Sequence, residues 1–130
     1  MNVHPNESMI REGYDAFLRG DLTTVAGFVS PDAAWHVAGS SPLAGVYKGH
    51  EELFAFFARL WEMTAGTVSI TARDILASED HAIVLTTLKA SRGDDHLEDD
   101  GVAVFKIADG KATEIWVFAE DQAKMDEFFS

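Results

Sequence analysis

The sequence contains no cysteine, only three prolines, and ten lysines and arginines against 22 aspartates and glutamates. Without cysteine the chain can form no disulfide framework, thiolate nucleophile or cysteine-ligated zinc site. The net charge of −12 disfavours binding to nucleic acid or to an anionic membrane surface, because the few basic residues are scattered. No apolar run approaches the roughly 20 residues that cross a bilayer, and the first residues lack a signal-peptide pattern. We therefore expect a cytoplasmic protein that binds neither nucleic acid nor a membrane.

The composition that remains is that of an ordinary globular protein. Apolar residues make up 47% of the chain and charged residues 25%. A length of 130 residues is enough for one hydrophobic core and too short for two. The sequence therefore predicts a single domain spanning residues 1–130.

Helical periodicity is concentrated in the first half of the chain. Apolar residues at the spacing of one helical face predict a helix over residues 7–19, with Asn6 or Ser8 as its cap and Gly20 at its end. Asp21 is a natural cap for a short second helix that Pro31 stops. A third helix is expected over residues 51–64, which carry the widest apolar face.

Strand patterns dominate the second half. A first short strand over residues 33–38 precedes a loop rich in glycine, serine and proline, and further strands are expected near residues 68–72, 82–90, 102–107 and 112–119. Asp109 and Gly110 form a strong hairpin signal, and residues 92–101 read as a polar loop. An amphipathic segment over 121–129 closes the chain. The order predicts an α+β fold with a mostly antiparallel sheet covered by helices from the N-terminal half.

Three stretches carry a resemblance to a known group of proteins. The segments YDAFLRGDL, WHVAGSSPLAGVYKG and VFKIADGKATEIWVFAED occur in the order and at the spacing found in the nuclear transport factor 2-like superfamily. The chain resembles in particular its SnoaL-like branch. The resemblance implies a cone-shaped, strongly curved sheet wrapped around the helices, with an apolar pocket on the concave face. It also implies pairing of two copies through the convex face.

The resemblance does not name a reaction, because this superfamily includes isomerases, cyclases, epoxide hydrolases, dehydratases and proteins without activity. The SnoaL-like cyclases and ketosteroid isomerases carry polar groups at positions that match Ala103, Val117 and the neighbourhood of Val37 here. Alanine and valine cannot transfer protons. Tyr14 does match a first-helix tyrosine that points into the isomerase pocket, although an aromatic residue on an apolar helical face is more often part of the core.

Side-chain alternation decides what Trp35 and His36 do. Neighbouring strand residues point to opposite faces, so Trp35 and Val37 are expected to face the pocket and His36 the convex side. A half-buried, hydrogen-bonded histidine is the favoured interpretation of His36. A slip of one residue would instead turn it inward as a general base.

Two functions follow as hypotheses. The first is a module that binds a small apolar molecule, with no cofactor and no metal. Its predicted ligand-binding residues are Tyr14, Trp35, Val37, Phe57, Trp61, Ala103, Phe105 and Val117. The alternative is an isomerase, cyclase or hydratase that uses His36 or Asp121 as acid or base and Tyr14 as hydrogen-bond donor, although Asp121 more often caps a helix.

The same alternation predicts a partner. In the last strand, Trp116 and Phe118 are expected on the convex face, opposite Val117. Large aromatic side chains on an outer face need cover, and a two-fold copy supplies it. We therefore expect a homodimer that pairs through the convex face at Trp116 and Phe118.

Overall fold

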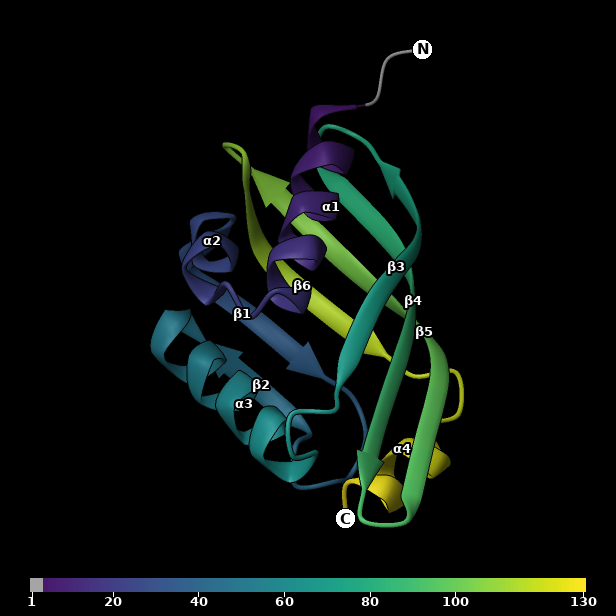
Figure 1. Ribbon diagram of the computed structural model, residues 1–130. Coiled ribbons are helices and arrows are strands. Elements are labelled where there is room, and N and C mark those ends of the chain that lie inside the picture. The colour runs from purple at the N-terminus through teal and green to yellow at the C-terminus, as the bar shows by residue number, and fades with distance from the viewer. Residues whose placement is uncertain (1–3) are drawn as a thin grey trace.

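The computed structural model describes residues 4–130 as four helices and one sheet of six strands (Figure 1). The helices are α1 (Pro5–Leu18), α2 (Leu22–Gly27), α3 (Gly49–Met63) and α4 (Gln122–Phe128). The strands are β1 (Val29–Val37), β2 (Gly45–Lys48), β3 (Ser69–Ala77), β4 (His81–Arg92), β5 (Asp95–Ala108) and β6 (Lys111–Phe118). The predicted α+β class is confirmed. Among these helices none is long and apolar enough to span a membrane.

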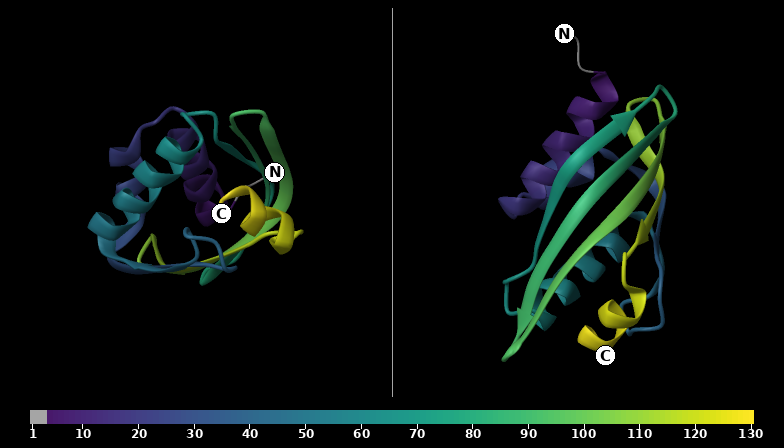
Figure 2. Two further views of the ribbon diagram at one scale, coloured as in Figure 1. Left: turned by 90° about the horizontal axis from the view of Figure 1, so that it is seen from below. Right: turned by 90° about the vertical axis from the view of Figure 1, so that its right-hand side faces the viewer.

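The strands follow one another in the order β2-β1-β6-β5-β4-β3. Only β1 and β6 run parallel, and every other neighbouring pair is antiparallel. The predicted hairpin at Asp109 and Gly110 joins β5 to β6, and both residues have the positive φ that such a turn requires. The sheet curls strongly, so that seen from below it closes around the helices (Figure 2).

The helices cover separate parts of the concave face. Helix α1 packs against β3, α3 packs against β1 and β2, and α4 lies against β5. In Figure 1, α1 and α3 stand apart, one over each half of the sheet. The concave face is therefore covered from its two sides rather than by one continuous helical layer.

The extent of strand β5 shows that one prediction was wrong. Residues 92–101 were expected to form a polar loop, but β4 continues to Arg92 and β5 begins at Asp95, so the turn is limited to Gly93 and Asp94. Leu97, Asp99 and Gly101 are buried on one face of this stretch and alternate with the exposed Glu98 and Asp100. A run that looks uniformly polar is therefore a strand with one charged face.

The first half of the chain needs smaller corrections. Strand β1 begins at Val29 instead of residue 33, and β2 was not predicted because its four residues follow directly on a loop. Helix α1 begins at Pro5, and its cap is His4, whose Nδ1 accepts a hydrogen bond from the backbone N–H of Asn6. The Asn6 side chain instead donates to the carbonyl oxygens of Ser78 and Glu79, which fixes α1 to the turn between β3 and β4.

Candidate functional site

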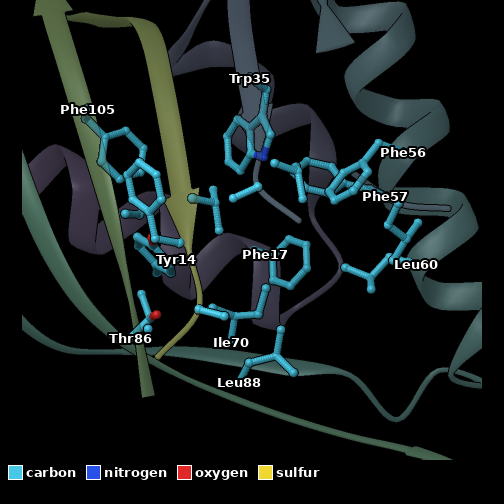
Figure 3. Close-up of a pocket in the computed structure, with 18 of the residues that line it drawn as sticks. Tyr14, Phe17, Trp35, Phe56, Phe57, Leu60, Ile70, Thr86, Leu88 and Phe105 are labelled. Atoms are coloured by element: carbon cyan, nitrogen blue, oxygen red, sulfur yellow. The ribbon is translucent and has the colours of Figure 1, made fainter. Parts of the chain in front are cut away.

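A cavity of about 170 Å³ lies between the concave face of the sheet and the helices (Figure 3). Side chains from α1, α3 and five strands form its wall, and nearly all of them are apolar. The residues that β-strand alternation turns inward include Trp35 and Val37 on β1, Phe105 on β5 and Val117 on β6. Because an apolar cavity of about 150 Å³ accepts benzene, this one has room for a small ring compound.

The structure places seven of the eight predicted ligand-binding residues in the cavity wall. These are Tyr14, Trp35, Val37, Phe57, Ala103, Phe105 and Val117. Trp61 is not part of the wall. Its ring packs edge-on against Phe17, 5.2 Å between centroids, and Phe17 takes the position at the cavity that was expected for Trp61. The predicted apolar face of α3 is present, but it is wider than the cavity. Residues at its margin, such as Trp61, therefore do not border the cavity.

Aromatic rings in edge-on contact give the wall its shape. Trp35 lies 5.6 Å from Phe57 and 6.5 Å from Phe105, measured between ring centroids. Tyr14 packs against the same Phe105 ring at 6.3 Å. Edge-to-face contacts of this kind hold rings in fixed orientations and add about 0.5–1.5 kcal/mol per pair beyond the area they bury. The cavity is therefore bounded by aromatic rings that pack on one another.

His36 lies outside the cavity, on the convex face. Its Nε2 is 2.8 Å from Oε2 of Glu114, and its ring is stacked on that of Trp116 with centroids 5.3 Å apart. His36 and Trp116 are register partners on the parallel strands β1 and β6. The prediction of an outward, hydrogen-bonded histidine is confirmed, and His36 is in no position to act as a base on a molecule in the cavity.

Asp121 is a helix cap. Its side chain accepts a hydrogen bond from the backbone N–H of Lys124 at 3.1 Å, at the start of α4. The residue is not part of the cavity wall. Its alternative role as an acid or base on a bound molecule is therefore not supported by its position.

The acid that does reach the cavity is Asp99, which sequence reasoning missed. Asp99 is 4% exposed, borders the cavity, and accepts hydrogen bonds from the backbone N–H groups of Glu120 and Asp121 at 3.2 and 3.1 Å. These bonds fix the corner between β6 and α4. The signal that could have found it is the alternation of Leu97, Asp99 and Gly101, which places all three on the concave face.

Burial controls the chemistry of Tyr14. The residue is half-buried, and its side chain borders the cavity. Loss of hydration disfavours the phenolate, so burial raises the pKa of Tyr14 well above its ordinary value. The hydroxyl therefore stays protonated at neutral pH, and within the described residues it has no hydrogen-bond partner. It can donate one hydrogen bond to a group in the cavity.

Comparison with known proteins agrees with the fold and with the resemblance of the sequence motifs. Residues 10–115 match the family of SnoaL-like domains. The chain belongs to this family. It is 29% identical to the uncharacterised Mycobacterium tuberculosis protein Rv0034, over 94% of each chain. The structure of Bal32a, from a soil-derived mobile gene cassette, superposes with a TM-score of 0.93 at 32% identity, covering 97% of both chains.

A second solved structure supports the same fold. A protein of unknown function with a cystatin-like fold, from Xanthomonas campestris, gives a TM-score of 0.90 at 27% identity, covering 100% of this chain and 99% of its own. The chain thus shares its architecture with proteins of unknown function, and the fold by itself does not name a reaction. Ala103 and Val117, which match the polar positions of the cyclases, do line its cavity but supply no titratable group.

The raised pKa of Tyr14 predicts a loss of stability in alkali. In the unfolded chain a tyrosine loses its proton near pH 10, whereas folded Tyr14 keeps its proton, so a rising pH favours the unfolded state above about pH 10. We expect the free energy of unfolding to fall by up to about 1.4 kcal/mol more per pH unit in the wild type than in Tyr14→Phe. Urea denaturation between pH 8 and pH 11 measures this difference. Identical pH profiles would contradict the burial of this hydroxyl.

The position of Asp99 predicts a large effect of a small substitution. Asp99→Asn removes the charge and one of the two acceptor oxygens that hold the backbone N–H groups of Glu120 and Asp121. We expect the free energy of unfolding to fall by about 1.5–3 kcal/mol, measured by urea denaturation. The matched control is Asp100→Asn, which lies on the opposite face of β5 and is exposed, and it should cost less than about 1 kcal/mol. Equal losses in both variants would contradict the role of Asp99.

Proposed function

We propose that this SnoaL-like protein binds a small apolar molecule in the cavity on the concave face of its sheet. The observation that carries the proposal is a cavity of about 170 Å³ that is walled by aromatic and aliphatic side chains. Protein cores are normally packed with few voids larger than a water molecule. An apolar space of this size lowers the stability of the protein in proportion to its volume, so a bound molecule that fills it stabilises the folded state.

The electrostatics of the wall support the same kind of ligand. Among the lining residues only Tyr14 and Asp99 are titratable, and Tyr14 stays neutral at pH 7 because burial raises its pKa. A strongly charged ligand would lose its hydration in this cavity without gaining an ion pair on most of the wall. A neutral ring compound instead gains contacts with Trp35, Phe57 and Phe105.

Proton-transfer catalysis is a second candidate, favoured by the position of Asp99. A buried carboxylate at the cavity could act as a base, with the Tyr14 hydroxyl as a hydrogen-bond donor. Binding is the preferred function because both oxygens of Asp99 already accept backbone hydrogen bonds at the corner of α4. The groups that were expected to act as acid or base, His36 and Asp121, do not border the cavity.

We also propose that two copies pair through the convex face. Register partners form a row of side chains across all six strands, here named the convex row: Leu76, Ile83, Val104, Trp116, His36 and Val46. Three of the five exposed large apolar side chains within residues 4–130 belong to this row: Val46, Leu76 and Ile83. Six strands span about 24 Å at the usual strand spacing, which suits one side of a standard interface of roughly 800 Å² per partner.

A second copy is the occupant that suits this face best. Charged residues on this face pair within the chain, Arg73 with Asp100 and Lys89 with Glu98, and His36 is within hydrogen-bond distance of Glu114. Because these charges are paired within the chain, the face has no excess of positive or negative charge that would favour a charged partner. Its apolar row can instead pack against the same row of a second copy about a two-fold axis.

The binding proposal predicts that filling the cavity blocks binding. Ala103 is buried in the middle of the wall on β5, so Ala103→Leu adds three carbon atoms to the space that a ligand would take. We expect toluene at ten times its dissociation constant to stabilise the wild type by about 1.4 kcal/mol, seen as a rise of a few degrees in Tm. The rise should be lost in Ala103→Leu.

The matched control for this experiment is Ala108→Leu, at the exposed end of the same strand. Its response to toluene should equal that of the wild type. If the wild type shows no rise in Tm with toluene, or if both variants respond like the wild type, the cavity is not the binding site.

The dimer proposal predicts that one charge in the convex row separates the copies. Ile83→Lys should convert a dimer into a monomer in light scattering coupled to size-exclusion chromatography, because an unpaired ammonium group would be buried between two apolar faces. The control is Leu18→Lys on α1, since Leu18 is 43% exposed and Ile83 44%. A wild-type monomer at high micromolar concentration, or a dimer in both variants, would contradict this interface.

A further inference from the structure

One polar atom near the cavity has no partner. The indole nitrogen Nε1 of Trp35 is buried and makes no hydrogen bond, and it is the only buried side-chain nitrogen or oxygen atom in residues 4–130 of which this is true. Buried tryptophan N–H groups usually have an acceptor, because an unpaired donor loses its hydration without replacement. The exception therefore needs an explanation.

The surroundings of Trp35 supply no acceptor. Its ring extends from β1 into the cavity wall and meets the edges of Phe57 and Phe105, which are hydrocarbon (Figure 3). Phenylalanine would supply aromatic contact at this position without leaving a polar atom unpaired. The indole is half-buried as a residue and borders the cavity, so the cavity is the side from which an acceptor can come.

A second donor lies on the same part of the wall. Tyr14 packs against the Phe105 ring, as Trp35 does, and its hydroxyl has no hydrogen-bond partner among the described residues. Burial raises the pKa of this hydroxyl, which keeps it protonated and able to donate. An indole N–H can only donate. The two polar groups that flank Phe105 are therefore both hydrogen-bond donors for which the described residues supply no acceptor.

We infer that the ligand is a small ring compound that carries a hydrogen-bond acceptor, such as a carbonyl oxygen, and that Trp35 Nε1–H donates to it. This inference rests on the proposed binding function and names the chemistry of its ligand. Nε1 itself is covered by neighbouring side chains and has no hydrogen bond to lose, so the acceptor reaches it when a neighbour moves aside. Plain hydrocarbons, and ligands whose polar group can only donate, would leave the N–H unpaired.

Acetophenone and α-methylstyrene test this inference directly. The two molecules share one ring and the same branched outline, and they differ in a carbonyl oxygen against a methylene group. Each is of a size that suits a cavity of about 170 Å³. The ratio of their dissociation constants, measured by isothermal titration calorimetry, contains the difference in their hydration. Comparing that ratio between the wild type and a variant removes the hydration term.

Trp35→Phe should change this ratio in favour of α-methylstyrene by about three- to ten-fold, the usual contribution of one hydrogen bond. The control is Trp61→Phe, which removes an indole that packs on Phe17 outside the cavity wall. Its ratio should equal that of the wild type. If both probes bind and the ratio is the same in all three proteins, Trp35 is not a donor to the ligand and the binding function still stands. If neither probe binds the wild type, the binding function fails and this inference fails with it.

A measurement on the wild type covers the case in which Trp35→Phe does not fold. The chain has three tryptophans, so its indole N–H groups give three nuclear magnetic resonance signals. Trp61→Phe and Trp116→Phe identify two of them and leave the signal of Trp35. Acetophenone should move the proton of that signal further downfield than α-methylstyrene does, because a hydrogen bond to oxygen deshields it. Equal shifts with the two probes would overturn the inference.

Discussion

The alternation of side chains along the curved sheet is the constraint on which the other features of this structure depend. On β5 every second residue from Leu97 to Ile107 is buried on the concave face, while the residues between them face outward. Register pairing carries the same alternation to β4 and β6, so Ala103 and Val117 face the same space. The sheet thereby acquires one apolar inner face, which forms the cavity wall, and one mixed outer face.

The placement of the helices explains why a cavity, and not a fully packed core, lies next to the inner face of the sheet. Helix α1 lies over β3, and α3 lies over β1 and β2, so the two helices cover the two sides of the concave face (Figure 1). Aromatic side chains from α1, α3, β1 and β5 border the cavity between them. Phe17 and Trp35 both contact Phe57 edge-on, and Trp35 also contacts Phe105, so rings from α1, α3, β1 and β5 form one connected part of the wall. Asp99 then holds the corner before α4. The same features that stabilise the fold thus leave room for a ligand.

Sequence reasoning predicted the features that alternation alone determines. The inward direction of Trp35, Val37 and Val117 and the outward direction of His36 follow from their positions on β1 and β6. Sequence reasoning failed where the position of a side chain depends on packing between segments that are far apart in the sequence. Trp61 lies on the expected face of α3, yet its ring packs on Phe17 from another helix, and Phe17 is the residue that borders the cavity. Asp99 was missed because it lies in an acidic run, and the charge of that run was interpreted as a sign of a loop. The run is in fact the first part of β5 and has the same alternation of buried and exposed residues as the rest of that strand.

Xenon binding tests the central claim, an apolar cavity between the concave face of the sheet and the helices, most directly. Xenon enters dry apolar cavities and needs no polar partner, so its binding depends only on space and on the chemistry of the wall. A crystal structure under xenon pressure should show a xenon atom in contact with Phe57, Phe105 and Val117. The same experiment would contradict the account if no xenon site appeared there and side chains filled the space between these residues.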